Sequence, residues 1–180
     1  MTEIMVNNEL TLKIPAADDA DEIYQLVADS RETLAKWLPW ATKETLEIQR
    51  QFLKENIKKF NEKQAMVFGI QYHDKYAGLI GFNTINQKLK QTEIGYWLTN
   101  DFVGHGIMQQ SLKALIRYGF NNLQLKKLIL KIAVDNDRSN HVAKKAGFTL
   151  NRVIPNGLDL NDGYHDENEW ILKKEADLNP

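Results

Sequence analysis

A glycine-rich turn, Val103-Gly104-His105-Gly106, leads from a strand-like segment directly into an amphipathic helix. Glycine lets a backbone approach phosphate oxygens closely, and the first N–H groups of a helix have no intrahelical partner. The helix dipole adds positive potential at the same end. The segment from Val103 to Met108 is therefore a candidate pyrophosphate-binding cradle. A pair of glycines also occurs where only a turn is required, so this segment alone leaves both interpretations open.

The spacing of residues around this turn excludes two common phosphate-binding motifs. The Gly-x-x-x-x-Gly-Lys-Ser/Thr pattern of a Walker A loop is absent. The dinucleotide-binding fingerprint needs a third glycine and a βαβ unit, whereas a hairpin precedes the turn here. That hairpin is predicted because Met66 to Tyr72 and Tyr76 to Thr84 flank the turn residues His73-Asp74-Lys75.

The hydrophobic periodicity of the chain predicts a mixed α/β fold. Strand-like segments are Leu10 to Ile14, Met66 to Tyr72, Tyr76 to Thr84, Glu93 to Leu98, Lys127 to Val134, Phe148 to Ile154 and Glu169 to Leu172. Five helical segments are predicted: one that begins at Asp18, one that includes Leu34 to Leu38, one over 43–62, one directly after the glycine turn and one over 138–146. This order favours one sheet of about seven strands covered by about four to five helices. No linker or repeat interrupts it, so we expect residues 1–180 to form a single domain.

The composition excludes several classes of protein. The chain has 180 residues and no cysteine, which rules out a disulfide scaffold, thiolate metal sites and a cysteine nucleophile. Lysine and arginine number 23 against 24 acidic residues, and this balance disfavours direct nucleic-acid binding. No apolar run reaches the length of about 20 residues that spans a bilayer, and the first residues lack a signal-peptide pattern. We therefore expect a cytoplasmic protein without membrane association.

A second polar segment, Asp135-Asn136-Asp137-Arg138-Ser139-Asn140, follows a nearly continuous apolar strand and precedes a short helix. Small polar side chains at such a junction can bind the free N–H groups of the helix. Helix capping by Asn136 or Ser139, and a C-terminal glycine at Gly147, would each explain part of the pattern. The segment on its own therefore does not require a ligand.

Taken together, the two segments resemble the GNAT (GCN5-related) N-acetyltransferase superfamily. Gly104-His105-Gly106-Ile107-Met108 precedes Asn136-x-x-Ser139-Asn140-x-x-Ala143-x-x-x-Gly147-Phe148. Ile94-Gly95-Tyr96-Trp97-Leu98 and Gly163-Tyr164-His165-Asp166 are similar to the RimJ/RimL branch, which acetylates the N-termini of ribosomal proteins. The resemblance extends from Leu10 to about Leu172. It implies a GNAT fold whose sheet splays between strands four and five, here Glu93 to Thr99 and Leu128 to Val134.

The resemblance also implies that acetyl-CoA is the cosubstrate and that no metal takes part. The pyrophosphate would lie on the glycine turn, and the pantetheine arm would enter between the splayed strands. One backbone N–H near Trp97 or Leu98 would polarise the thioester carbonyl. The residues implied in cofactor binding are Trp97, Leu98, Thr99, Val103, Gly104, His105, Gly106, Ile107, Met108, Asn136, Asn140 and Lys144.

Direct attack by an amine is expected, because the chain has no cysteine that could carry an acetyl group. The leaving thiolate then needs a proton, and the resemblance places the hydroxyl of Ser139 near the sulfur, with helix capping as the alternative role. The family's glutamate base corresponds to Leu158 in this sequence. Glu93, acting through water, and Asp159, which follows Leu158 but points to the other face of an extended segment, are the remaining candidates.

The acceptor side is marked by aromatic and acidic residues. Trp37 and Trp40 lie near the expected substrate edge, and Tyr164 lies in an acidic segment able to attract a cationic amine. Helix-end packing and a solvated loop are the alternative roles of these residues. A site without a strong base favours an α-amine, because an amine of pKa about 8 costs only about 1.4 kcal/mol to deprotonate at pH 7, against about 4.6 kcal/mol for lysine.

We therefore predict an acetyl-CoA-dependent N-acetyltransferase that acts on the N-terminal α-amine of a protein, ribosomal by the resemblance. The same family resemblance implies a homodimer. Two alternatives stay open at this point. One is acetylation of a small amine, such as a polyamine, an amino acid or an aminoglycoside-like compound. The other is an acyl-CoA-binding module without catalysis.

Overall fold

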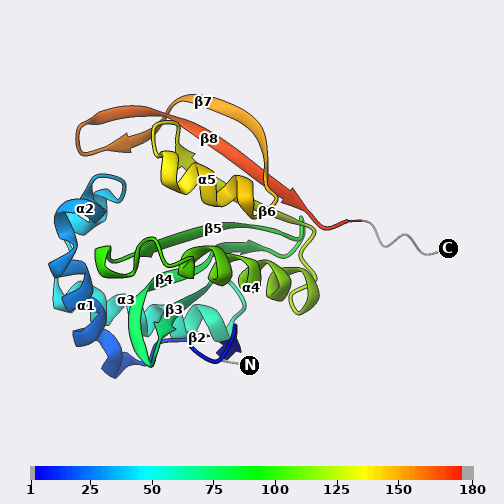
Figure 1. The fold of residues 1–180 in the computed structure, drawn as a ribbon. Coiled ribbons are helices and arrows are strands. Elements are labelled where there is room, and N and C mark those ends of the chain that lie inside the picture. Colours follow the sequence, from blue (N-terminus) through cyan, green and yellow to red (C-terminus); the bar gives the residue numbers. More distant parts are fainter. Residues whose placement is uncertain (1–2, 176–180) are drawn as a thin grey trace.

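Eight strands form one mixed sheet, in the order β1-β2-β3-β4-β5-β6-β8-β7, among residues 3–175, which the computed structural model describes (Figure 1). Neighbouring strands are antiparallel except β5 and β6, which are parallel. The expected strands are present, and β1 is a further short edge strand that the pattern did not indicate. The strands are β1 (Glu3–Met5), β2 (Leu10–Lys13), β3 (Met66–Tyr72), β4 (Lys75–Asn86), β5 (Gln91–Leu98), β6 (Lys127–Ala133), β7 (Thr149–Leu160) and β8 (Gly163–Lys173).

Helices cover both faces of the sheet (Figure 1). Helix α4 packs on one face, where Leu112 joins a core cluster that contains Phe68 and Phe82. Helices α1 and α3 cover the other face, where Leu53 and Trp97 belong to a second cluster. No helix in the described part of the chain is long and apolar enough to cross a membrane. The α-helices of this part are α1 (Ala20–Asp29), α2 (Arg31–Ala35), α3 (Leu46–Asn61), α4 (Ile107–Asn121) and α5 (Asp137–Lys145).

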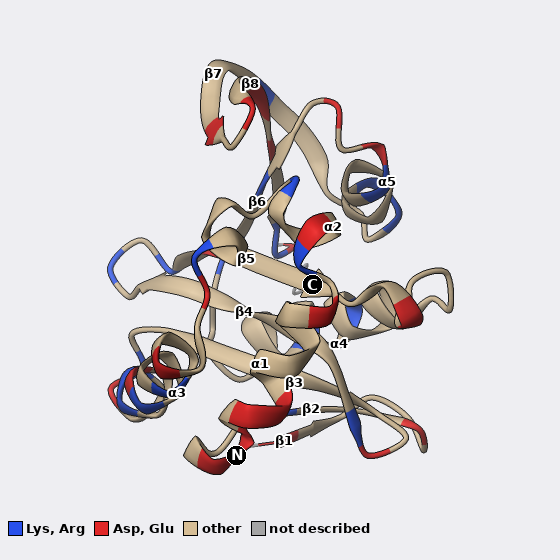
Figure 2. Ribbon diagram, turned by 90° about the vertical axis from the view of Figure 1, so that its left-hand side faces the viewer, with Lys and Arg blue, Asp and Glu red and all other residues tan. Residues whose placement is uncertain are grey.

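Strands β5 and β6 are paired only where they begin. Gln91–Glu93 of β5 pairs with Lys127–Ile129 of β6, and the pairing ends there. Strand β6 instead stays paired with β8 along its whole length. Figure 2 shows β7 and β8 rising away from β1–β5. Residues 94–98 of β5 therefore have no strand partner on the side of β6, and the splay expected between these two strands is confirmed.

The β7–β8 hairpin is longer than the sequence predicts. The expected strands end at Ile154 and resume at Glu169, whereas the observed strands reach Leu160 and Gly163. In the acidic segment considered as a solvated loop, Asp159, Asp166 and Glu167 thus belong to the two strands, and Asp162 lies in the turn between them. Most residues between 155 and 166 are exposed, so the alternation of apolar and polar residues that marks a half-buried strand is missing.

An asparagine of α3 takes the place of a missing strand beside β3. Strand β2 pairs only with Gly69–Tyr72 of β3, which leaves Val67 without a strand neighbour on that side. The Nδ2 of Asn56 donates to the Val67 carbonyl at 2.8 Å, and its Oδ1 accepts from the Val67 N–H at 3.0 Å. The Asn56 side chain is buried. This contact fixes α3 on the sheet, and α3 supplies one wall of the cavity described below.

We expect the substitution Asn56→Leu to destabilise the protein, because it leaves two partly buried backbone groups of Val67 without partners. At about 1–3 kcal/mol for each unpaired group, the free energy of unfolding should fall by roughly 2–6 kcal/mol. Denaturation in urea would measure the change. Lys54→Leu, at an exposed position of the same helix, is the control and should stay within about 0.5 kcal/mol of the wild type. Equal midpoints for the two variants would contradict the role given to Asn56.

Candidate active site

The glycine-rich turn presents free backbone donors at the start of α4. Gly104 and Gly106 have φ values of 90° and 73°, a region that side-chain-bearing residues rarely adopt. The first hydrogen bond of the helix runs from the Gln110 N–H to the Gly106 carbonyl at 3.1 Å, so the N–H groups of residues 107–109 have no helical acceptor. The first turn holds no acidic residue. The turn is therefore suited to bind an anion such as a phosphate.

Three other residues expected at this end of the cofactor have less direct support. The N–H of Val103 donates to the Asn100 carbonyl at 3.2 Å and is not one of the free donors. His105 is exposed in the turn, and Lys144 is exposed in the last turn of α5. Their contacts with phosphate or adenine stay predictions.

The free edge of β5 identifies which backbone groups face the gap toward β6. The N–H of Thr99 donates to the Ala77 carbonyl of the β4 side at 2.9 Å. In an antiparallel strand these directions alternate, so the N–H of Trp97 also points toward β4, while those of Tyr96 and Leu98 point toward the gap. Because β4 already uses the N–H of Thr99, this group gives no support to the expected binding of a ligand by the backbone of Thr99. Of the three expected residues, Leu98 offers a free N–H.

The polar turn after β6 faces β5 across this gap. The Tyr96 hydroxyl lies 3.4 Å from the Ser139 carbonyl oxygen, and burial raises the pKa of Tyr96 to about 12. Asn136 caps α5, because its Oδ1 accepts from the Ser139 N–H at 3.2 Å. The cap thus uses the backbone of Ser139 and not its hydroxyl. The structure gives this hydroxyl no hydrogen-bond partner among residues 3–175, which leaves it available to a ligand in the gap.

Asn140 has a structural role that the sequence did not predict. Its Nδ2 donates to the carbonyls of Ala133 and Asn136 at 2.8 and 2.9 Å. Its Oδ1 accepts from Asn168 Nδ2 at 3.0 Å and from Trp170 Nε1 at 2.8 Å. These partners use both donors and both acceptor positions of the amide. Asn140 therefore joins β6, α5 and β8, and its predicted contact with the pantetheine arm is not supported by a free group.

The two carboxylates predicted as bases lie in different surroundings. Glu93 is half-buried on the same face of β5 as Trp97, and its carboxylate lies 3.7 Å from Lys131 Nζ. Lys131 also lies 3.9 Å from the buried carboxylate of Glu167. Burial raises the pKa of Glu167, an effect that the charge of Lys131 opposes. Asp159 is exposed on β7. Glu93 is thus the predicted carboxylate that faces the α3 side of the sheet.

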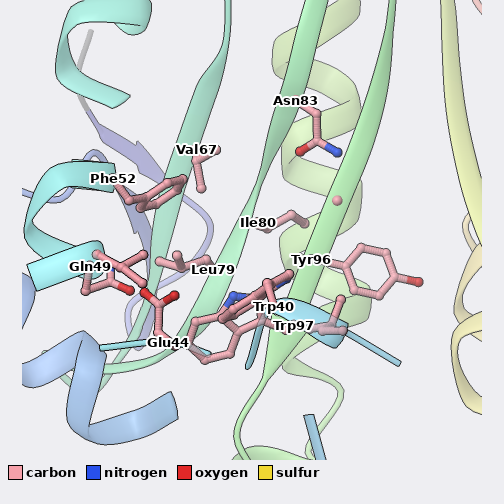
Figure 3. A pocket seen from close by; sticks show the side chains of 13 residues that line it. Trp40, Glu44, Gln49, Phe52, Val67, Leu79, Ile80, Asn83, Tyr96 and Trp97 are labelled. Atoms are coloured by element: carbon pink, nitrogen blue, oxygen red, sulfur yellow. The ribbon is translucent and has the colours of Figure 1, made fainter. Parts of the chain in front are cut away.

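A cavity of about 390 Å³ opens on the α3 side of the sheet, next to β5 (Figure 3). Trp40, in the turn Pro39–Thr42 that follows α2, forms an aromatic wall with Trp97, and their ring centroids are 6.3 Å apart. The cavity therefore reaches β5 at Gly95, Tyr96 and Trp97, within the part of the strand that is not paired with β6. Its lining residues are Leu38, Trp40, Glu44, Ile48, Gln49, Phe52, Val67, Leu79, Ile80, Asn83, Gly95, Tyr96 and Trp97.

Of the three residues predicted to contact the acceptor, Trp40 lines this cavity and the other two do not. Trp37 is half-buried nearby, with Lys36 Nζ 4.8 Å from its ring centroid. Tyr164 is 69% exposed near the tip of the β7–β8 hairpin. The hairpin places Tyr164 outside the cavity because the segment is extended and does not fold back as a loop.

Two polar residues of the cavity were not found from the sequence. Glu44 and Gln49 are buried, with 8% and 3% of their surfaces exposed. Burial raises the pKa of Glu44, and the charge of Arg31 opposes that shift. The one available signal was the position of Gln49, which stands four residues before the buried Leu53 and so on the apolar face of α3.

A histidine attaches the β7–β8 hairpin to the turn after β6. His165 Nε2 lies 2.9 Å from an Asp162 oxygen, and its Nδ1 lies 3.3 Å from Asp135. The hydrogen bond with Asp162, followed by that with Asp135, raises the pKa of His165. The hydrogen bond with His165 in turn lowers the pKa of Asp162. At the hairpin tip, the Asn161 amide donates to the Ala35 carbonyl of α2 at 2.9 Å, so the hairpin is held at two points.

The chain is similar to acetyltransferases over most of its length. Residues 9–149 match the family model of the acetyltransferase (GNAT) domain. A ribosomal-protein-serine acetyltransferase of Escherichia coli (strain K12) is 35% identical over 170 residues, which are 93% of this chain and 95% of that protein.

Two solved structures with bound ligands have the same fold. The RimL ribosomal L7/L12 alpha-N-protein acetyltransferase in complex with coenzyme A has a TM-score of 0.94 at 32% identity, and the match covers 97% of this chain and 99% of that one. The microcin C7 self-immunity acetyltransferase MccE, in complex with acetyl-CoA and AMP, has a TM-score of 0.89 at 30% identity and covers 94% of each chain.

We expect the pKa of His165, measured by an NMR pH titration of its ring protons, to lie above the ordinary value of 6.5. The contacts of protonated His165 stabilise the fold fully at pH values below the pKa that this histidine has in the unfolded chain. That stabilisation is lost as the pH rises through the higher pKa that it has in the folded protein. Asp162→Asn should move the midpoint back toward 6.5, whereas Asp166→Asn, which removes a neighbouring exposed charge, should change it less. A midpoint that is insensitive to Asp162→Asn would show that this ion pair does not form.

Proposed function

This chain belongs to the acetyltransferase (GNAT) family, and from that premise we propose that it acetylates the N-terminal α-amine of a ribosomal protein, with acetyl-CoA as donor. The observation that carries the proposal is the free edge of β5, which adjoins an anion-binding turn at one end and an apolar cavity on the α3 side. The acceptor is proposed from the ribosomal-protein acetyltransferases at 35% and 32% identity. The match over residues 9–149 supports the view that residues 1–180 act as one domain.

The residues present fit acetyl-CoA. The free N–H groups of residues 107–109 would hold the pyrophosphate, as the positive φ values of Gly104 and Gly106 allow. The unpaired backbone groups of Tyr96 and Leu98 would bind the pantetheine arm as a neighbouring strand would. When bound, acetyl-CoA supplies an acetyl group already activated as a thioester.

The chain's own groups meet the demands of direct transfer. The N–H of Leu98 would donate to the carbonyl oxygen on which negative charge develops. The hydroxyl of Ser139 would give its proton to the sulfur as the carbon–sulfur bond breaks and the carbon–nitrogen bond forms. Glu93 would receive, through water, the proton that the nitrogen loses once the carbon–nitrogen bond has formed, and solvent would return a proton to Ser139. An α-amine suits this arrangement because its deprotonation at pH 7 costs only about 1.4 kcal/mol.

Acetylation of a small amine is the second candidate, because a cavity of about 390 Å³ can also hold a small molecule. MccE, at 30% identity, has been crystallised with acetyl-CoA and AMP. A polyamine fits less well, since Glu44 is the one carboxylate among the lining residues and the remaining walls are mostly apolar.

A panel of acceptors would test the proposed function. We expect acetyl-CoA to bind in a calorimetric titration, and free thiol to be released with peptides that begin with Ser, Ala or Met. Mass spectrometry should place the acetyl group on the α-amine of the peptide. Turnover of spermidine without turnover of any peptide would contradict the proposed acceptor. Binding of acetyl-CoA without turnover of any amine would instead indicate a non-catalytic acyl-CoA-binding module.

Replacing Ser139 by alanine should lower kcat without changing the fold. Loss of a general acid typically costs about 100-fold or more in rate, while the KM for acetyl-CoA should stay close to the wild-type value. Stability should be retained, because Asn136 caps α5 through the backbone N–H of residue 139. His141→Ala, at an exposed position of the same helix, is the matched control. A kcat for Ser139→Ala equal to that of the control would exclude this role of the hydroxyl.

A further inference from the structure

The cavity beside β5 contains a buried carboxylate with no protein partner. Glu44 is 8% exposed, and its side chain makes no ion pair or hydrogen bond with any residue between 3 and 175. The nearby guanidinium of Arg31 donates to the backbone carbonyls of Ala41 and Glu44 and not to this carboxylate, although its charge still acts on it. A carboxylate that is largely removed from water and makes no ion pair favours a ligand that brings a cation or a hydrogen-bond donor.

An unpartnered amide lies beside this carboxylate. Gln49 is 3% exposed, and its Nε2 is buried without a hydrogen-bond partner. Glu44 and Gln49 line the same cavity as Trp40 and Trp97, and in the view of Figure 3 both polar side chains lie on the side of α3. Buried N–H groups in native proteins nearly always have a partner, so a ligand that brings an acceptor into the cavity would satisfy this one.

A ligand that binds both Glu44 and Gln49 must carry a donor for one side chain and an acceptor for the other. The carboxylate of Glu44 needs a cation or a hydrogen-bond donor, whereas the Nε2 of Gln49 needs an acceptor. The first residue of a peptide has both, because its α-ammonium group and its carbonyl oxygen are separated by a single carbon. A polyamine has cationic donors but no acceptor, so it would leave the Gln49 amide unpaired.

We propose that Glu44 and Gln49 together bind the amino-terminal residue of the acceptor, with Glu44 on the α-ammonium group and Gln49 on the first carbonyl oxygen. This inference deepens the proposed function and rests on it for the identity of the acceptor. Deprotonation at this site is balanced: one proton moves from the ammonium nitrogen to a Glu44 oxygen, which leaves a neutral amine and a neutral carboxylic acid. The freed amine then stands in a cavity that reaches β5 at Gly95, Tyr96 and Trp97.

The mouth of the cavity indicates how the acceptor continues. Trp40, Ile48 and Phe52 all line it and are 41%, 48% and 37% exposed. Large apolar side chains at the rim of a pocket are typical of surfaces that bind another chain. The amino-terminal segment of the acceptor would therefore leave the cavity between the turn at Trp40 and helix α3.

Binding measured in the presence of saturating CoA tests the inference without requiring turnover. The probe is a heptapeptide that begins with Ser, and calorimetry gives its Kd. We expect Glu44→Gln to raise the Kd by about 10- to 100-fold, because a charge-assisted hydrogen bond is lost. Glu47→Gln is the matched control, since it removes the same charge from an exposed position in the first turn of α3. The N-acetylated peptide, which has no ammonium group, should bind wild type and Glu44→Gln equally weakly.

The second variant separates this inference from a merely structural effect. Gln49→Leu should raise the Kd of the peptide by about 10-fold, yet change the Kd of spermidine little, because spermidine has no acceptor for the amide. Equal peptide Kd values for wild type and Glu44→Gln, or no peptide binding to wild type, would overturn the inference. Failure of the proposed function gives a different pattern, namely no thiol release from wild type with any peptide although the Kd values shift as expected.

Discussion

The backbone of β5 beyond Glu93 has no strand partner on its β6 side, and the site is arranged around that unpaired edge. Peptide groups that leave water need hydrogen-bond partners, so an open edge within a sheet is a place for a ligand. The opposite side of the gap is closed by the protein itself. Asn140 takes up the carbonyl of Ala133 at the end of β6, and Asn136 caps the helix that follows. The end of β6 is thus partly satisfied by the protein itself, whereas the N–H groups of Tyr96 and Leu98 on β5 stay free.

Each face of the sheet has its own hydrophobic cluster, and each cluster positions a different part of the site. The larger cluster fixes α4, and with it the anion-binding turn, against β3 and β4. The smaller cluster holds α1 and α3 on the other face and contains Trp97, which also lines the cavity. Asn56 replaces a missing strand beside β3 and so fixes the position of the α3 wall. An acetyl donor and an amine acceptor can thus approach the same short stretch of β5 from different directions.

The buried carboxylates fall into two kinds. Glu167 lies beside Lys131, and Glu169 is paired with Arg152, which lowers its pKa. Glu44 has no such ion pair in the described part of the chain, and burial raises its pKa more than the nearby charge of Arg31 lowers it. A compensated carboxylate mainly holds elements together, whereas an uncompensated one in a cavity is suited to bind a cation or to accept a proton. This contrast distinguishes Glu44 from the other acidic residues on the same face.

Local patterns were sufficient to predict the strands from β2 to β6, the five helices and the glycine turn before α4. Each depends on residues close together in the chain: alternating side chains, a helical repeat, or two glycines before a helix. The same reasoning missed the far half of the β7–β8 hairpin, whose exposed residues carry no apolar alternation. It also expected backbone groups of Thr99 and the side chain of Asn140 to bind a ligand, although the N–H of Thr99 already has a partner in β4 and the amide of Asn140 one in β8. Glu44 and Gln49 were not found at all, because a polar residue becomes significant only when folding buries it without a partner. Whether a backbone or side-chain group is free depends on contacts between residues far apart in the chain, and only the tertiary structure decides those.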